Sequence, residues 1–259
     1  MSHTGIIAPM PVEANPLVPA SALKSERRGR SFDVYQWRNA GSQISLACSG
    51  VGFRRAAEAT RYLLDECDVE RIIVCGVAGG LASVNRTGDL VLPQHVRAYN
   101  AVANAGLITQ GPTDMDAIGP AFNVDKDLRQ AAFSAARSEV LGGLLVSVRG
   151  LVTSIPILEW FQKVLCATAV DMEAAAVGEV CARAGTPFLV VRALSDYAPE
   201  LARWDWACLA LARKRGGLGL ASHHLRHPAL AARLWRLNRD IKRSAHEAAK
   251  IVKELLQQL

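Results

Sequence analysis

Two carboxylates stand near the ends of apolar segments in the second half of the chain. Glu173 lies in the run VDMEAAA at residues 170–176, and Asp196 closes the run RALSD at 192–196. Both apolar segments predict buried strands, and strand ends that face one crevice are where α/β folds build active sites. Two acids in such a place can divide the chemistry, one binding hydroxyl groups and the other donating a proton.

Three further segments with polar or glycine residues follow predicted strands. They are the run GIIAPMPVE at 5–13, which ends in Glu13, SGVG at 49–52, and CGVAGGL at 75–81. Glycine lets a backbone approach a ligand closely, and free N–H groups there can bind an anion or a sugar oxygen. Each segment taken alone is equally explained by a tight turn, a helix start or a solvated glutamate. None is a dinucleotide-binding fingerprint or a phosphate-binding loop.

The elements that position these residues follow from the hydrophobic pattern. Short apolar runs alternate with amphipathic stretches, which predicts one α/β domain over 1–259 with a central mixed or parallel sheet between helices. Glycines 79 and 80 are expected to form a turn. Strands are expected at 5–8, 34–37, 44–48, 71–76, 89–92, 144–148, 167–170 and 188–193, and helices at 56–65, 128–137, 155–164 and 173–184.

Composition narrows the class of protein. Half of the 259 residues are apolar and 21% are charged, which is typical of a globular protein, and no run of eighteen apolar residues predicts a membrane span. The N-terminus has no signal-peptide pattern, so a cytoplasmic protein is expected. The six cysteines lack metal-ligand spacing, which predicts buried reduced thiols, no metal site and no cofactor.

The positive charge is concentrated late in the chain. The net charge is +6, but residues 203–243 carry ten Lys/Arg and two Asp/Glu, a local net charge of +8. This basic segment is also rich in Leu and Trp, and we expect it to be an insertion before a final helix. It has two interpretations: a solvated or packed surface element, or a membrane-surface element whose arginines meet anionic headgroups. No nucleic-acid motif accompanies it.

Taken together, the motifs resemble the nucleoside phosphorylase and nucleosidase superfamily, and within it the methylthioadenosine/S-adenosylhomocysteine nucleosidases. The resemblance rests on six segments in the family's order across about residues 5 to 200: 5–13, 49–52, 75–81, 88–91, 170–176 and 192–196. It implies a three-layer α/β/α fold and cleavage of a purine N-glycosidic bond through an oxocarbenium-like ribosyl cation. It also implies a homodimer.

The resemblance assigns roles to individual residues. Asp196 would protonate the purine at N7, Glu173 would accept hydrogen bonds from the ribose hydroxyls, and Glu13 would orient or deprotonate water. The other expected contacts lie around these three. Met172 would pack on the sugar, Ser195 and Arg192 would support Asp196, Leu151 and Val152 would meet the base, Val77 and Gly79 would line the glycine-rich segment, and Trp206 or Trp204 would line the 5′ side.

The nucleophile is predicted from what the chain lacks. Phosphorylases of this family typically carry arginines after the first strand and before the glycine-rich segment, where this chain has 8–13 (APMPVE) and Val74. Glu13 would repel phosphate but suits water, so hydrolysis is favoured. Arg54 and Arg55 keep a phosphate-dependent reaction open, and Val77 replaces the hydroxyl residue usual in the family.

The substrate is predicted from two departures. Leu151 stands where the nucleosidases have an aromatic residue against adenine, and the basic segment 203–243 follows Asp196. Together they resemble the hopanoid-associated branch, which releases adenine from adenosylhopane to leave ribosylhopane. This would place the protein peripherally at the inner face of the membrane. The alternatives are a methylthioadenosine/S-adenosylhomocysteine nucleosidase, a purine nucleoside phosphorylase, and a nucleoside-binding module without catalysis.

Overall fold

A mixed β-sheet forms the centre of the computed structural model, which describes residues 2–25, 31–136, 139–204 and 228–259. The strands are β1 (His3–Ala8), β2 (Leu23–Lys24), β3 (Asp33–Asn39), β4 (Ser42–Cys48), β5 (Arg71–Gly80), β6 (Leu90–Val91), β7 (His95–Tyr99), β9 (Ile118–Asn123), β10 (Val140–Leu141), β11 (Leu144–Ser147), β13 (Ala167–Asp171) and β14 (Phe188–Tyr197). A small second sheet pairs β8 (Leu107–Ile108) with β12 (Leu151–Val152).

The strand order explains why the predicted site residues converge. The main path runs β2-β3-β4-β1-β5-β13-β11-β7-β9, and β14 pairs with β5 and β6. Strands β1, β4, β5 and β14 are parallel, so their carboxyl ends lie at one edge of the sheet. Antiparallel pairs such as β3 with β4 and β5 with β13 make the sheet mixed. The predicted α/β class is confirmed.

Strand β5 is longer than the sequence predicts. The glycine-rich segment is not a turn, because β5 continues to Gly80 and pairs with β14 on one side and with Val170 and Ala169 of β13 on the other. A glycine allows this close approach: a Cβ on Gly79 would lie 3.1 Å from Ala198 Cβ and 3.2 Å from Asp196 Oδ2. The prediction of a turn at 79–80 was therefore wrong.

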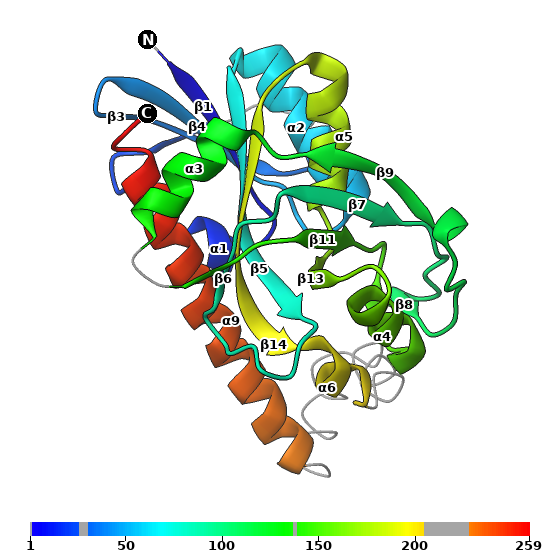
Figure 1. Cartoon of the computed structure of the whole chain (residues 1–259). Helices are drawn as coiled ribbons and strands as arrows, with labels where there is room; N and C mark the ends of the chain where they lie inside the picture. Colours follow the sequence, from blue (N-terminus) through cyan, green and yellow to red (C-terminus); the bar gives the residue numbers. More distant parts are fainter. Residues whose placement is uncertain (1, 26–30, 137–138, 205–227) are drawn as a thin grey trace.

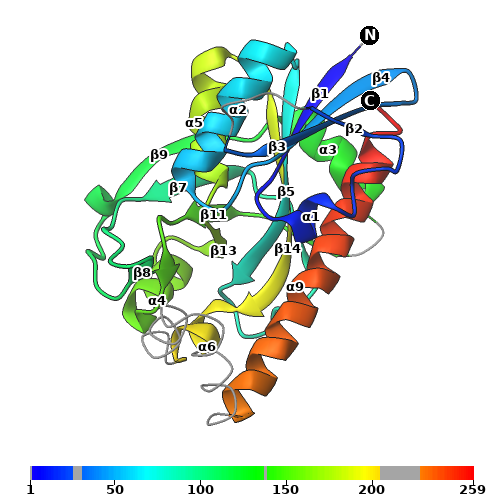
Figure 2. The ribbon, with the colours of Figure 1, turned by 180° about the vertical axis from the view of Figure 1, so that it is seen from behind.

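Helices cover both faces of the sheet (Figure 1). They are α1 (Pro11–Ala14), α2 (Phe53–Cys67), α3 (Lys126–Ala135), α4 (Ile155–Lys163), α5 (Ala174–Ala184), α6 (Ala198–Ala202) and α9 (Pro228–Leu255), with a 3₁₀ turn at Met115–Ala117. Helices α2 and α5 pack together on one side, and α1 and α3 contact α9 on the other (Figure 2). The predicted three layers are thus present.

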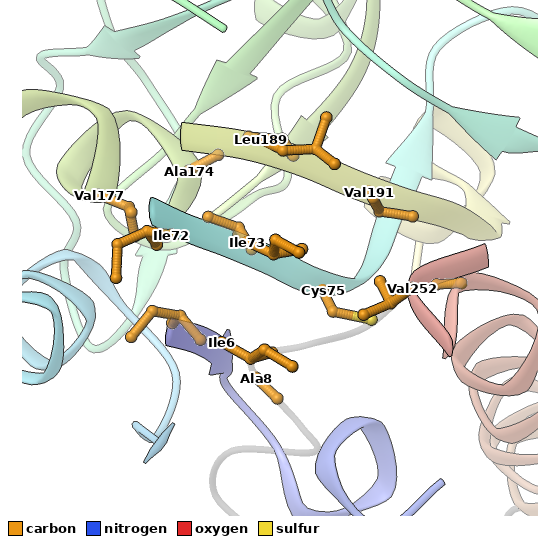
Figure 3. Close-up of a cluster of buried hydrophobic side chains, with 14 of the residues drawn as sticks. Ile6, Ala8, Ile72, Ile73, Cys75, Ala174, Val177, Leu189, Val191 and Val252 are labelled. Atoms are coloured by element: carbon orange, nitrogen blue, oxygen red, sulfur yellow. The ribbon is translucent and has the colours of Figure 1, made fainter. Parts of the chain in front are cut away.

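The core lies where these layers meet strands β1, β5 and β14. Ile6, Ile73 and Leu189 are fully buried there. Figure 3 shows these strands together with Val177 of α5 and Val252 of α9. Strands buried on both faces read as continuous apolar runs, which is why the sequence pattern located them.

The basic segment does not sit entirely before the last helix. Helix α9 begins at Pro228, so residues 228–243 form its first half rather than an insertion ahead of it. Residues 205–227, including Trp206, lie outside the described residues. The second half of α9 buries Ala248, Val252 and Leu255 against the sheet. Within the described part of the chain, no helix is both long enough and apolar enough to cross a membrane.

Candidate active site

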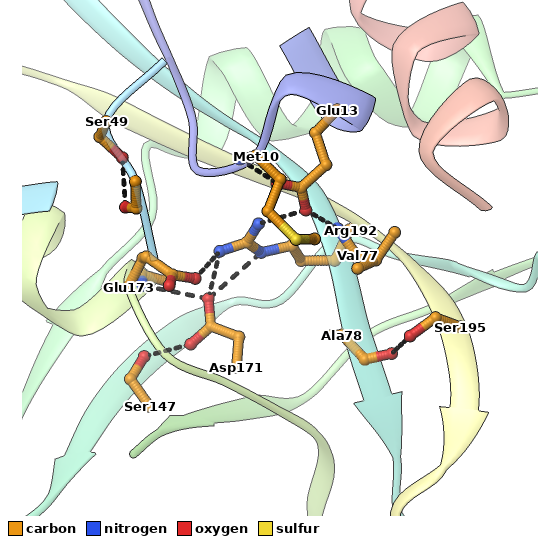
Figure 4. A network of polar contacts seen from close by, with 12 residues as sticks. Met10, Glu13, Ser49, Val77, Ala78, Ser147, Asp171, Glu173, Arg192 and Ser195 are labelled. Atoms are coloured by element: carbon orange, nitrogen blue, oxygen red, sulfur yellow. Dashed lines mark hydrogen bonds and ion pairs between the residues drawn. The ribbon is translucent and has the colours of Figure 1, made fainter. Parts of the chain in front are cut away.

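A buried arginine stands at the centre of a cluster of carboxylates (Figure 4). Arg192 of β14 is fully buried, and its guanidinium faces Asp171, Glu173 and Glu13. Its Nη2 lies 2.5 Å from Asp171 Oδ2 and 3.2 Å from Glu173 Oε2, and its Nη1 lies 3.9 Å from Glu13 Oε1. Arg192 Nη1 has no hydrogen-bond partner among the described residues.

Asp171 is the anchor of this cluster. Its Oδ2 accepts hydrogen bonds from Arg192 Nε and Nη2 and from the backbone N–H of Ala174, while its Oδ1 accepts one from Ser147 Oγ at 2.5 Å. Ser147 Oγ in turn accepts the N–H of Ala175. These contacts satisfy free N–H groups in the first turn of α5. The motif around Glu173 is therefore held in place from both sides.

Glu13 reaches the cluster from the short helix α1. Its Oε2 accepts the N–H of Met10 at 2.7 Å, and its Oε1 accepts the N–H of Val77 at 2.8 Å. Burial raises the pKa of Glu13, although Arg192 and these two N–H groups favour the charged form. Each carboxylate oxygen keeps one free lone pair, so Glu13 can still accept a proton or a hydrogen bond.

Gly76, in the glycine-rich segment 75–81, leaves room for Glu13 and Arg192. Gly76 lies opposite Arg192 in the β5–β14 ladder. A Cβ on Gly76 would lie 2.3 Å from Glu13 Oε1 and 2.4 Å from Arg192 Nη1. A larger residue would displace the end of one of these two buried side chains, so glycine fits the site at this position.

Glu173 caps the cluster on the side of α2. Its Oε1 accepts the N–H of Gly52 at 2.8 Å, which ties the SGVG segment to the α5 motif. Burial raises the pKa of Glu173 to about 8, and the neighbouring carboxylates Asp171 and Glu13 add to the shift while Arg192 opposes it. One guanidinium cannot balance three buried carboxylates, so a proton is retained among them near neutral pH.

Arg192 itself stays charged. Burial alone would lower its pKa, but Asp171, Glu173 and Glu13 outweigh burial and raise the pKa above its ordinary value. Its partners differ from those expected from the sequence: Arg192 supports the three carboxylates, and among the described residues no hydrogen bond or ion pair joins it to Asp196. The ladder shifts register between Leu194 and Asp196, and a bulge of this kind re-aims the side chains that follow it.

Asp196 stands apart from the arginine cluster. Ser195 Oγ donates a hydrogen bond to Asp196 Oδ1 at 2.6 Å and lies 3.4 Å from the carbonyl of Ala78. Burial raises the pKa of Asp196 to about 6, and the Ser195 hydrogen bond acts in the opposite direction. A carboxyl with such a pKa is partly protonated near neutral pH and can act as a general acid.

One pocket of about 220 Å³ joins these groups. Its walls are mainly apolar, and they include Glu13, Glu173 and Asp196 together. The structure brings nearly all of the predicted site residues to this pocket: Glu13, Val77, Gly79, Leu151, Val152, Met172, Glu173, Ser195 and Asp196 line it. Arg192 lies beneath it, held to Glu173. The prediction for Trp206 falls outside the described residues.

Sequence reasoning missed the residues that support the site. These residues are Asp171, Ser147, Gly52 and Gly76. The first three form the hydrogen bonds just described, and Gly76 leaves space for Glu13 and Arg192. Asp171 stands two residues before Glu173, and its acidic character in an otherwise apolar strand was the available signal. Among the described residues, no group of three or more His, Cys, Asp or Glu side chains is placed to hold a metal ion.

Comparison with known proteins assigns the family. Over residues 3–215 the sequence matches the family described as the Phosphorylase superfamily. The chain belongs to the Phosphorylase superfamily. Its fold also matches solved members of nucleosidase type over the full chain, as the resemblance of the motifs implies.

Solved nucleosidase structures that are at least 25% identical to the chain include two bacterial enzymes. The 5′-methylthioadenosine/S-adenosylhomocysteine nucleosidase of Neisseria meningitidis, in complex with methylthio-immucillin-A, is 26% identical, with all of both chains covered and a TM-score of 0.75. The corresponding nucleosidase of Colwellia psychrerythraea, in complex with adenine, is 25% identical, with a TM-score of 0.71. The match covers 100% of this chain and 96% of that nucleosidase. A futalosine hydrolase of Helicobacter pylori has the same fold as this chain, with a TM-score of 0.76 and 21% identity. The match covers 100% of this chain and 98% of the hydrolase.

Proposed function

We propose that the protein is a nucleosidase that hydrolyses the N-glycosidic bond of a 5′-substituted adenosine and releases adenine. The observation that carries this proposal is the position of Asp196 in one pocket with Glu173 and Glu13. Burial gives Asp196 a pKa of about 6, while the other two acids lie against Arg192. A proton donor and a separate carboxylate cluster are what cleavage of a glycosidic bond requires.

The proposed reaction assigns one step to each acid. Asp196 donates its proton to N7 of the base as the bond between C1′ and N9 breaks. Glu173 holds the ribose hydroxyls, with Met172 against the sugar. Water attacks C1′ and gives its proton to Glu13. The products are adenine and the free 5-substituted ribose, and the proton on Glu13 returns to solvent while Asp196 regains one.

Hydrolysis is favoured over phosphorolysis by the surroundings of Glu13. Its carboxylate is buried, and the only described cation beside it, Arg192, is already shared with Asp171 and Glu173. Val77 contributes its N–H to Glu13 and has no hydroxyl to offer a phosphate. An anion would meet three carboxylates here, whereas a water molecule meets acceptors for its protons.

For the substituent at the 5′ carbon, we propose a lipid and, within that class, the hopane of adenosylhopane. Two features support this choice: the nucleoside pocket is mainly apolar, and the first half of α9 is basic and aromatic. Trp235 there is 66% exposed beneath the guanidinium of Arg239. Basic helices with exposed tryptophan suit the interface of an anionic membrane. The second candidate is a methylthioadenosine/S-adenosylhomocysteine nucleosidase, which the full-length likeness to such enzymes favours.

The deciding experiment compares substrates and products. Purified protein is incubated with adenosylhopane in mixed micelles, with methylthioadenosine and with S-adenosylhomocysteine, each with and without phosphate. Adenine and the sugar are quantified by mass spectrometry. We expect a free ribosyl product that does not depend on phosphate. A ribose 1-phosphate product would overturn hydrolysis, and turnover of methylthioadenosine with none of adenosylhopane would overturn the lipid substrate.

The assembly and location are further proposals. A homodimer follows from the resemblance, and light scattering after gel filtration measures it. Peripheral contact with the inner face of the membrane follows from the charge of α9. Co-sedimentation with vesicles of phosphatidylglycerol, compared with vesicles of phosphatidylcholine alone, tests that contact.

A further inference from the structure

A second hollow, of about 270 Å³, adjoins the nucleoside pocket. We call it the arginine hollow, because three of its six described lining residues are arginines. Its walls are Val51, Gly52, Phe53, Arg54, Arg55 and Arg149. No acidic side chain is among them. The catalytic roles proposed above use none of these three arginines.

The arginine hollow and the nucleoside pocket share a wall. Val51 lines both, and it is 43% exposed at their common rim. On the opposite side, Val148 and Gly150 line the nucleoside pocket, whereas Arg149 between them lines the arginine hollow. A ligand that extends past Val51 therefore passes from an apolar pocket to a strongly basic one.

All three arginines are exposed, and they line the same hollow. None of them forms an ion pair with a carboxylate in the described part of the chain. Arg149 stacks over the ring of Phe53, with its Cζ 4.5 Å from the ring centroid. Arg55 packs beside Gly50, where a Cβ would lie 2.8 Å from its Nη1. The N-terminus of α2, which begins at Phe53, adds a partial positive charge.

The position of the hollow identifies which part of a nucleoside faces it. The N–H of Gly52 donates to Glu173, the proposed partner of the ribose hydroxyls, so the hollow lies on the sugar side. Another cavity meets the nucleoside pocket at the opposite group, Ser195 and Asp196, where the base would be protonated. With the 2′ and 3′ hydroxyls directed to Glu173, the 5′ substituent is the part of the sugar left to extend past Val51.

We propose that the arginine hollow binds an anionic oxygen group, a carboxylate or a phosphate, carried on the distal part of the 5′ substituent. This inference rests on the proposed nucleosidase function and narrows its substrate class. Guanidinium groups bind such oxyanions by charge-assisted hydrogen bonds, and three unpaired arginines repel each other until an anion joins them. The hydrocarbon hopane carries no such group, so this inference and the lipid substrate proposed above predict opposite preferences, which the acid and the amide below separate.

The test uses two nucleosides that differ in one charge. They are 5′-deoxy-5′-(2-carboxyethylthio)adenosine and its primary amide, which have the same length and shape. With the wild-type protein we expect kcat/KM for the acid to exceed that for the amide by about tenfold or more. Arg149→Gln, and the triple change Arg54→Gln, Arg55→Gln, Arg149→Gln, should remove the preference. The matched control is Arg61→Gln. Arg61 is an exposed arginine of α2 that does not line the hollow, so this variant should keep the preference for the acid.

The outcomes separate this inference from the function on which it rests. Turnover of both nucleosides without preference in the wild type would overturn the anion subsite and leave the nucleosidase standing. Release of adenine from neither would overturn both. Two further assays identify another source of the oxyanion. Free phosphate is the source if the sugar product depends on phosphate and Arg149→Gln raises the KM for phosphate. A lipid headgroup is the source if the triple variant loses binding to vesicles. Either, without a preference for the acid, would overturn the assignment to the 5′ substituent.

Discussion

Arg192 Nη2 lies 2.5 Å from Asp171 Oδ2, and both side chains are buried. The pair joins β14 to β13 across the floor of the pocket, and it places a positive charge beneath Glu173 and Glu13. Removing Arg192 would leave three carboxylates without a countercharge. Removal of one partner from a buried ion pair typically costs about 3–5 kcal/mol.

We therefore expect Arg192→Met to lower the free energy of unfolding by about 3–5 kcal/mol at pH 7.5. The loss should shrink as the pH falls toward 5, because Glu13 and Glu173 have raised pKa values and take up protons easily. Arg192→Lys should recover only part of the stability, since an ammonium cannot reach both carboxylates as a guanidinium does. Urea unfolding at the two pH values measures this, and an equal loss at both would count against the account.

Asp196→Asn separates catalysis from folding. It removes the proposed proton donor, so adenine release should fall by about 10²–10⁴-fold. Burial raises the pKa of Asp196 to about 6, so the folded state binds this proton more tightly than the unfolded state does. Its ionised form therefore costs stability above pH 6, and this cost disappears below pH 4. The Asn variant should be more stable than the wild type at pH 7.5, by about 2–3 kcal/mol, and nearly equal at pH 4. Thermal melts and product assays measure both effects, and an active Asn variant would contradict the role.

Ser195→Ala should move the pH profile without abolishing activity. The Ser195 hydroxyl stabilises the ionised form of Asp196 through the 2.6 Å hydrogen bond. Without it the pKa of Asp196 rises further, and the fall of kcat/KM at high pH should shift upward by about 1 unit. Ser195→Thr keeps the hydroxyl and is the control that should retain the wild-type profile. An unchanged profile in the Ala variant would show that Asp196 is not the group that titrates.

Gly76→Ala tests the space behind the carboxylates. The new methyl group would lie where Glu13 Oε1 and Arg192 Nη1 now stand, so we expect a loss of about 1–3 kcal/mol and a sharply reduced kcat. Gly119→Ala is the matched control, because its Cβ would meet neighbours only at 3.6 Å or more and its φ is not positive. Near wild-type activity and stability in Gly76→Ala would refute the fit described here.

Nucleoside binding should release a proton from Glu173. Burial raises the pKa of Glu173 to about 8, so the carboxylate cluster retains a proton near pH 7, and ribose hydroxyls that donate to Glu173 would favour its carboxylate form. Asp196→Asn holds the substrate without cleaving it and removes the competing titration of Asp196. Calorimetry of methylthioadenosine binding in two buffers of different ionisation enthalpy should then show up to about one proton released. The double variant that adds Glu173→Gln should release none, and proton uptake in the single variant would contradict the proposal.

The sequence predicted the buried strands and the convergence of the three acids, because apolar runs and carboxyl-end motifs are local signals. The partners of Arg192 were not predictable in this way. They lie on β13, at the N-terminus of α5 and on α1, which only the three-dimensional packing brings to Arg192. The extra residue in β14 near Ser195 then shifts the register with β5 and changes where Asp196 points. The course of β5 through Gly80 and the start of α9 at Pro228 were also missed, since glycine and proline mark breaks locally while pairing across the sheet decides the outcome.

Helix α9 makes a polar contact with the strand of the proposed acid: Ser244 Oγ donates to the carbonyl of Leu194 at 2.6 Å. Leu194 lies two residues before Asp196, and the second half of α9 covers the apolar face of β14 and β5. During synthesis β14 leaves the ribosome before α9 does. The nascent chain therefore holds every proposed catalytic residue while the strand that carries Asp196 still lacks its cover, and such exposed sheet surface favours aggregation. The cover over the strand that carries the general acid therefore comes from residues that are synthesised after every proposed catalytic residue.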